Sequence, residues 1–276
     1  MTDVAAPASA PANARRPARR VQGSRHFGLI VAVAGFLLFW EASVHFFNVQ
    51  QFILPPPSAV ATKFAEDLLS GAIIPHFRVT LIEVLCGFFL AATLGMILGS
   101  AIALIGVLER TLYPFILALQ TVPKIALAPL FLIWFGYGLQ SKIVTAGLIA
   151  FFPVLVNVIS GMRTVDPRRI LLMRALNASF LQTFLKVRLP SMLPQLFAGL
   201  EVAIIFAVIG AIVGEFIGAS TGLGSLIVQR QASVDVSGVF SVLVYLSLMG
   251  ITLNFVLRLL ARRFAFWQRS REIVSA

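Results

Sequence analysis

The sequence has few charged residues and almost no cysteine. Only 12% of its 276 residues are charged, whereas about a quarter are charged in a typical soluble domain. The single cysteine, Cys86, cannot form a disulfide bond within the chain, and no cluster of cysteines is present that could bind zinc. These shortages exclude a disulfide-stabilised domain and argue against a typical cytosolic enzyme.

The sequence also lacks the motifs of common catalytic sites. A Walker-type phosphate loop needs Gly-Lys followed by Ser or Thr, and none of the four lysines follows a glycine. The three histidines are scattered, and no paired carboxylates share one helical face. We therefore expect no catalytic residues, no metal ligands and no cofactor on this chain. A membrane enzyme without a familiar motif is an alternative.

What the sequence has instead is apolar residues, which make up 59% of the chain at a mean hydropathy of +0.94. So large an excess has no soluble core to enter, which points to membrane lipid as the solvent. The net charge of +11 would otherwise suggest nucleic acid as a partner. In a membrane protein, Lys and Arg collect on the cytoplasmic side, so we expect no nucleic-acid binding.

Six apolar stretches are long enough to span a bilayer, which needs about 20 residues. They are residues 27–48, 80–106, 113–135, 141–162, 197–219 and 238–260. Pro123 and Pro129 interrupt the third stretch, and Pro153 lies in the fourth. Such breaks are tolerated where protein or a water-filled cavity satisfies the freed carbonyl groups, so we expect the third span to be kinked or partly unwound.

The basic residues predict the orientation of these spans. With both termini in the cytoplasm, seventeen Lys and Arg residues fall on the inner side. Four fall on the outer side, namely Lys63, Arg78, Lys142 and Arg230. This bias predicts an even number of spans. We divide the chain into a disordered basic cytoplasmic tail (1–25), a transmembrane domain (26–265) and a cytoplasmic C-terminal tail (266–276).

Two segments between the spans have structure of their own. Ser58 follows three prolines and is a candidate N-cap for a short amphipathic outer helix that ends at Leu69. The longest inner loop, about residues 163–190, has Asp166 and Pro167 as the cap and first turn of another helix.

The apolar residues of this inner loop suggest a docking face. Ile170, Met173, Leu176 and Phe180 recur at helical spacing. The resulting helix is too polar to span the membrane and too apolar to stay uncovered. It would lie either on lipid headgroups or in the groove of a partner protein.

The inner loop resembles the EAA loop of bacterial ABC importer permeases, whose pattern is Glu-Ala-Ala, then Gly, then an aliphatic residue and Leu-Pro. Leu189 and Pro190 match the end of that pattern, and Val187 the aliphatic position. Asn177 replaces the glycine, and Leu171-Leu172-Met173 replace Glu-Ala-Ala. The matching segment predicts a coupling site whose residues are Met173, Arg174, Leu176, Asn177, Ala178, Val187, Leu189 and Pro190.

Further segments are similar to the nitrate, sulfonate and taurine branch of these permeases. They are the Leu-Pro-Pro-Pro-Ser of 54–58, the Pro-Lys-Ile-Ala-Leu-Ala-Pro-Leu of 123–130, the Phe-Phe-Pro of 151–153, Asn157 with Gly161, and Glu215 with the Gly-Leu-Gly of 222–224. Their order and spacing cover roughly residues 50–265. The resemblance implies an all-α, six-span permease of the MetI-like, type I importer fold.

The same resemblance implies an assembly. The permease would pair with a second copy, bind two cytoplasmic ABC ATPase subunits through the EAA loops, and receive solute from a periplasmic binding protein. ATP and Mg would then be bound by the ATPase partners. The implied solute is a small anion. Alternatives are a vitamin precursor carried by the same family, or an ion-gradient transporter that needs no ATPase.

Several residues within the spans are candidates for the translocation path. Lys124 stands in a predicted span, where an ammonium group is costly and usually faces a cavity or a partner. It would either attract an anion in the path or pair with Glu83, Glu201 or Glu215. The remaining path candidates are Asn157, Gly210, Gly214 and Glu215. Gly210 and Gly214 lie on a small-residue face that would equally suit helix packing within the subunit.

Overall fold

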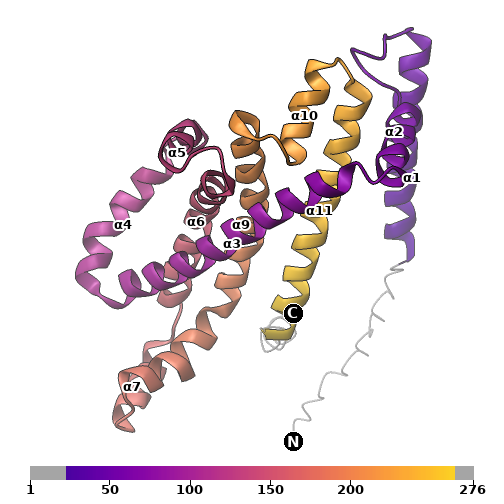
Figure 1. The fold of residues 1–276 in the computed structure, drawn as a ribbon. Coiled ribbons are helices and arrows are strands. Elements are labelled where there is room, and N and C mark those ends of the chain that lie inside the picture. The colour runs from indigo at the N-terminus through magenta and orange to yellow at the C-terminus, as the bar shows by residue number, and fades with distance from the viewer. Residues whose placement is uncertain (1–22, 265–276) are drawn as a thin grey trace, which may run out of the picture. The chain divides into compact units, whose positions relative to one another are not determined.

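The computed structural model describes residues 23–264, and all regular structure in that range is helical. The chain runs through α1 (Gly23–Phe46), α2 (Pro57–Leu69), α3 (Ile73–Leu104), α4 (Gly106–Gln120), η1 (Lys124–Leu127), α5 (Ala128–Phe135), α6 (Leu139–Arg163), α7 (Pro167–Ala175), α8 (Phe180–Thr183), the π-helical η2 (Phe184–Arg188), α9 (Leu189–Gly218), α10 (Leu223–Ala232) and α11 (Val236–Phe264) (Figure 1). The expected tails lie outside the described residues, except that α1 already begins at Gly23.

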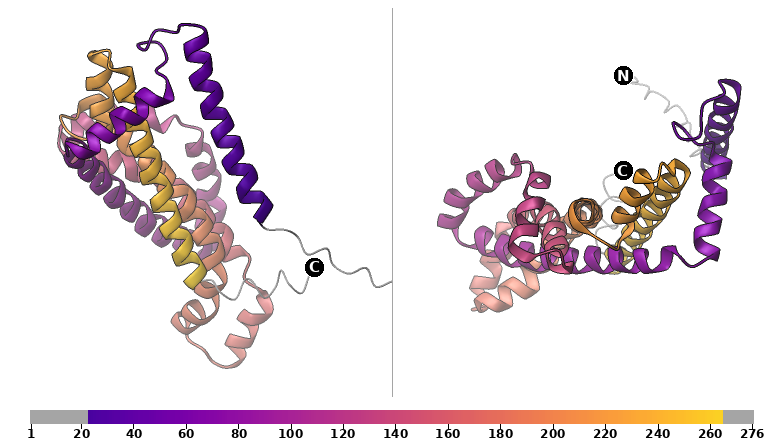
Figure 2. Two further views of the ribbon diagram at one scale, coloured as in Figure 1. Left: turned by 90° about the vertical axis from the view of Figure 1, so that its right-hand side faces the viewer. Right: turned by 45° about the horizontal axis from the view of Figure 1, so that its top comes forward.

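Contacts divide the chain into two units, residues 1–48 and 49–276. In the first unit, α1 is an apolar helix whose described side chains are mostly exposed. All other helices belong to the second unit. In the second unit, α7 (salmon) and α10 (orange) lie at opposite ends of the long helices (Figure 2, left).

Four helices are long and apolar enough to span a membrane: α3, α6, α9 with the turns before it, and α11. The pair formed by α4 and residues 124–135 passes the same test but bends by 86° at its break. This confirms the interruption predicted from Pro123. Residues 30–46 of α1 form a shorter apolar helix. The described residues therefore contain four or five spans by this measure, fewer than the six expected.

The core forms where α6 packs between α3 and α9. Gly87 of α3 and Gly210 of α9 both face Ala146 of α6, and a Cβ at either glycine would lie 2.6 Å from an Ala146 atom. Gly95 and Gly99 meet the next turns of α6 in the same way. Small residues thus bring three helix backbones into close contact, which is how membrane helices gain packing energy.

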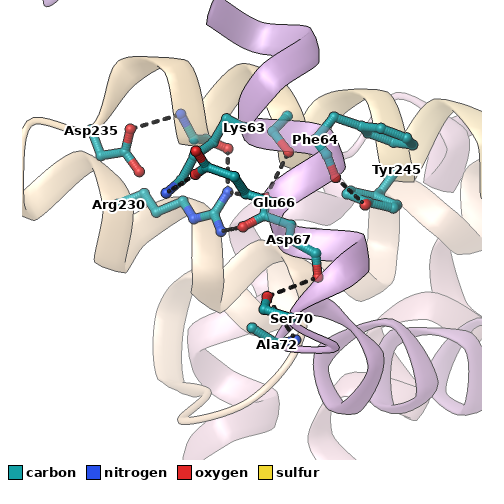
Figure 3. A network of polar contacts seen from close by, with 11 residues as sticks. Lys63, Phe64, Glu66, Asp67, Ser70, Ala72, Arg230, Asp235 and Tyr245 are labelled. Atoms are coloured by element: carbon teal, nitrogen blue, oxygen red, sulfur yellow. Dashed lines mark hydrogen bonds and ion pairs between the residues drawn. The ribbon is translucent and has the colours of Figure 1, made fainter.

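A polar network joins α2 to the hairpin of α10 and α11 (Figure 3). The guanidinium of Arg230 donates to both carboxylate oxygens of Asp67, at 2.5 and 2.7 Å, and also to the Gly238 carbonyl. Ser241 donates to the same carboxylate at 2.8 Å. Phe64 stacks on Tyr245, whose hydroxyl donates to the Phe64 carbonyl. These contacts fix α2 as part of the folded unit.

Several predicted boundaries were wrong. The N-cap of α2 is Pro56 and Ser58 lies inside the helix, because Pro57 suits the first helical position. The second span begins at Ile73 rather than near 80. The fifth begins at Leu189 rather than near 197, and α8 and η2 run directly into it.

Candidate functional site

The break between α4 and α5 places Lys124 at the edge of the helical core. The helix α4 ends at Gln120, three residues before Pro123, whose preceding residue is disfavoured in a helix. Lys124 begins the 3₁₀ turn that follows. Its Nζ donates to the Gln120 carbonyl at 3.0 Å and lies 4.6 Å from the centre of the Phe152 ring. The ammonium therefore satisfies a carbonyl at a helix C-terminus, where positive charge is favoured.

Lys124 lines a cavity of about 550 Å³ between α4, α6 and α9, a size typical of small-molecule sites. The lining residues are Gln120, Lys124, Ile125, Ile149, Phe152, Pro153, Val156, Asn157, Val202 and Phe206. Asn157 donates to the Pro153 carbonyl at 2.8 Å. The cavity thus combines an ammonium and two side-chain amides with apolar and aromatic walls.

Lys124 does not pair with any of the three carboxylates that the sequence suggested. Among residues 23–264, no carboxylate lies within ion-pair distance of Lys124. Glu83 lies 3.7 Å from Lys142, Glu201 is paired with Arg258, and Glu215 accepts hydrogen bonds from Thr80 and Gly224.

Lys142 corrects another expectation. The sequence placed it in an outer segment, yet it is 5% exposed within α6 and its Nζ lies 3.7 Å from Glu83 Oε1. It is thus an ammonium buried in the first turn of α6 and not a solvated flanking charge. The group nearest its ammonium, Glu83, lies on another helix. One sequence signal could have revealed this site: His76, Thr80 and Glu83 recur at helical spacing and form a polar face of α3.

The other path candidates lie apart from the cavity. Gly210 contacts the backbone of Ala146, and Gly214 contacts the Lys142 side chain. Glu215 is 1% exposed. None of these three lines the cavity. The structure brings together Lys124 and Asn157 only, and it places the two glycines in the packing between α6 and α9.

The predicted coupling segment folds as a helix, a turn and a second helix. Asp166 caps α7 by accepting from the Arg168 amide at 2.9 Å, which confirms the predicted start. The helix ends at Ala175. Asn177 has a φ of 53°, so it takes the left-handed conformation that favours Gly and tolerates Asn. Ala178 then donates to the Met173 carbonyl at 2.9 Å.

This turn overturns the predicted single apolar face, because Leu176 and Phe180 are not on α7. Ser179 caps the next helix, α8, through a capping box with Gln182. Ile170 and Met173 are half-buried. The large apolar side chains that stay exposed across the segment are Leu171, Leu172, Leu176, Phe180, Leu181 and Leu185.

The last three predicted coupling residues are helical. Val187 lies in the π-helical turn, and Leu189 and Pro190 form the first turn of α9. The last part of the segment, from Phe180 onward, is therefore continuous with a spanning helix.

The chain matches known transport proteins over most of its length. Residues 91–266 match the model of the binding-protein-dependent transport system inner membrane component family. The putative aliphatic sulfonates transport permease protein SsuC of Bacillus subtilis is 30% identical, covering 96% of this chain and 95% of its own. The riboflavin transport system permease protein RibX of Chloroflexus aurantiacus is 38% identical, covering 88% and 91%. The taurine transport system permease protein TauC of Escherichia coli is 28% identical, covering 86% and 88%.

The fold is also that of a solved transporter. A chain of the MetNI methionine ABC transporter in an inward-facing conformation superposes with a TM-score of 0.62 at 22% identity, covering 72% of this chain and 98% of its own. The helices around the cavity and the segment before α9 all fall within the matched family region. The chain belongs to the binding-protein-dependent transport system inner membrane component family, the permeases of ABC importers.

Proposed function

We propose that this permease moves a small organic anion across the inner membrane through the cavity at Lys124. The observation that carries the proposal is an ammonium group with no carboxylate partner among the described residues, at the wall of a cavity of about 550 Å³. An ammonium at the wall of such a cavity with no carboxylate partner attracts anions. Two relatives named above are described as permeases for sulfonates and taurine.

A vitamin precursor is the second candidate. Phe152 and Phe206 line the same cavity, and their rings would suit a flat aromatic solute. Relatives described as permeases for riboflavin and formylaminopyrimidine match this chain at 38% and 34% identity.

We also propose six spans with both termini in the cytoplasm. The bent pair of α4 and residues 124–135 would form one span, and α1 the sixth. The end of the long helices that bears α7 carries Arg168, Arg169 and Arg174, and α11 ends with Arg262 and Arg263. This clustering of basic residues supports a cytoplasmic location for that end.

The proposed assembly contains a second permease copy, two ABC ATPase subunits and a periplasmic binding protein. Leu171, Leu172, Leu176 and Phe180 are between 59% and 69% exposed, and Phe180 begins the helical run that continues into α9. Exposed apolar groups of this kind suit a partner's groove. ATP and Mg would be bound and hydrolysed by the ATPase partners, whose closure would move α8 and α9 and open the path.

Reconstitution tests the proposal. The chain should copurify with an ABC ATPase, and proteoliposomes with the binding protein should take up an organic sulfonate only when ATP is supplied. Uptake of riboflavin in place of the sulfonate would favour the second candidate. Uptake driven by an ion gradient without ATP would contradict both.

A further inference from the structure

A buried polar cluster lies where three spanning helices meet the start of α10, away from the cavity. It contains Thr80 and Glu83 of α3, Lys142 of α6 and Glu215 of α9. Thr80 and Glu83 are fully buried, Glu215 is 1% exposed and Lys142 is 5% exposed. Buried charges are costly unless they are paired and hydrogen-bonded, so the partners of each group matter.

Glu215 is held as a carboxylate. Thr80 Oγ1 donates to its Oε1 at 2.6 Å, and the Gly224 amide donates to its Oε2. Thr80 in turn accepts from the Leu223 amide at 2.8 Å. These amides belong to the first turn of α10, where the helix dipole favours negative charge. Glu215 therefore has two donors and a favourable field.

Glu83 has neither. Glu83 lies one helical turn after Thr80 on α3, and Thr80 binds Glu215, so the two glutamates are neighbours, yet neither oxygen of Glu83 has a hydrogen-bond partner. Lys142 Nζ lies 3.7 Å from Oε1, whereas charge-assisted hydrogen bonds are about 2.7–2.9 Å long. With both glutamates ionised, the cluster would hold two negative charges and one positive charge out of water, with the two like charges adjacent.

We propose that Glu83 and Glu215 bind one proton between them, carried by Glu83. The proton makes the cluster neutral, because the Glu215 carboxylate then balances the Lys142 ammonium. It also supplies the missing donor, so that the Glu83 hydroxyl can donate to Glu215.

The groups that would respond to this proton come from each helix packed against it. They are Lys142 from α6, Glu215 from α9 and His76 from α3, whose ring hydrogen-bonds to the Gly222 backbone. His76, Thr80 and Glu215 together hold the start of α10. Movement of α10 away from α3 would remove the Gly224 donor from Glu215 and shift the proton toward it.

Infrared spectroscopy of the purified full-length chain in detergent at neutral pH tests the proton directly. The wild type should show the C=O stretching band of a protonated carboxylic acid, and E83Q should lose it. The control E201Q should keep the band, because Glu201 pairs with Arg258 at an exposed site. A wild-type spectrum without the band, or a band that survives in E83Q, would overturn the proposal.

Thermal unfolding of the same variants is the second readout. E83Q mimics the protonated acid, so its Tm should match that of the wild type, while E215Q should lose several degrees. If Glu83 were instead the ionised partner of Lys142, E83Q would leave a buried ammonium unpaired. An equal loss of Tm in E83Q and E215Q, or failure of E83Q to fold, would therefore refute a proton on Glu83. Neither readout depends on the solute or the ATPase, so both are independent of the proposed transport function.

Discussion

Replacing Asp67 with Asn should destabilise the folded chain by about 3–5 kcal/mol, the usual effect of removing one partner from a buried ion pair. Asp67 is 4% exposed, and Arg230 donates to both of its oxygens. D67N leaves the guanidinium buried without its counter-ion. At about 2–4 °C per kcal/mol for a chain of this size, the Tm should fall by about 6 °C or more.

The matched control for D67N is E66Q, which removes a carboxylate from the same helix, α2. Glu66 pairs with Lys63 at 3.3 Å, but its side chain is 60% exposed, and surface pairs contribute about 0–1 kcal/mol. The Tm of E66Q in detergent should therefore stay within about 2 °C of the wild-type value. If D67N shifted the Tm no more than E66Q does, the network in Figure 3 would not hold α2 in place.

The pH dependence of this pair has a definite sign. Burial raises the pKa of Asp67, but hydrogen bonds from Arg230 and Ser241 outweigh burial and lower the pKa below its ordinary value. The pair's contribution to stability is therefore fully present above about pH 4. It is lost as the pH falls through the lowered pKa of Asp67. The Tm of D67N should therefore fall less than that of the wild type over this pH range.

Three further predictions concern packing, coupling and orientation. A G210L substitution should prevent folding, because even a Cβ would lie 2.6 Å from an Ala146 atom, whereas G250L should be tolerated at a position with no neighbour within 4 Å; detergent-solubilised yield and Tm compare the two. The double variant L176D/F180D should fold normally yet lose ATP-driven uptake, and full uptake would exclude docking through the exposed apolar segment. A single cysteine replacing Ser179, in a chain without its native cysteine, should react only with reagent on the cytoplasmic side; labelling from outside would reverse the proposed orientation.

Much of the fold could be predicted because its signals are local. Long apolar runs predicted the spanning helices, and Pro123 predicted the break in the third. The Asp166 cap followed from side-chain chemistry. The start of α3 was missed because the proline and polar residues of its first turns do not stop a helix there. The start of α9 was missed because α8 and η2 continue into it, so Pro190 lies within a longer helical run.

The site was less predictable because its partners come from distant parts of the chain. Lys142 was predicted to be a flanking charge, because nothing near it in the sequence indicates that Glu83 lies 3.7 Å away in the fold. Gly210 and Gly214 were ambiguous for the same reason, because a small-residue stripe shows close packing but not the helix it meets. Lys124 was singled out as a charge within a predicted span, but the cavity beside it becomes visible only once α6 and α9 are placed.

Uptake by Lys124 variants in the reconstituted transporter tests the central claim most directly. K124Q should reduce uptake of the anionic solute about tenfold or more, because a hydrogen bond to a charged group contributes about 1.5–3 kcal/mol. Assembly and basal ATPase activity should be unchanged. K124R should keep part of the uptake, and K63Q, which removes a lysine from α2 outside the cavity, should keep all of it. Equal uptake by the wild type and a stably assembled K124Q transporter would contradict an anion path at Lys124.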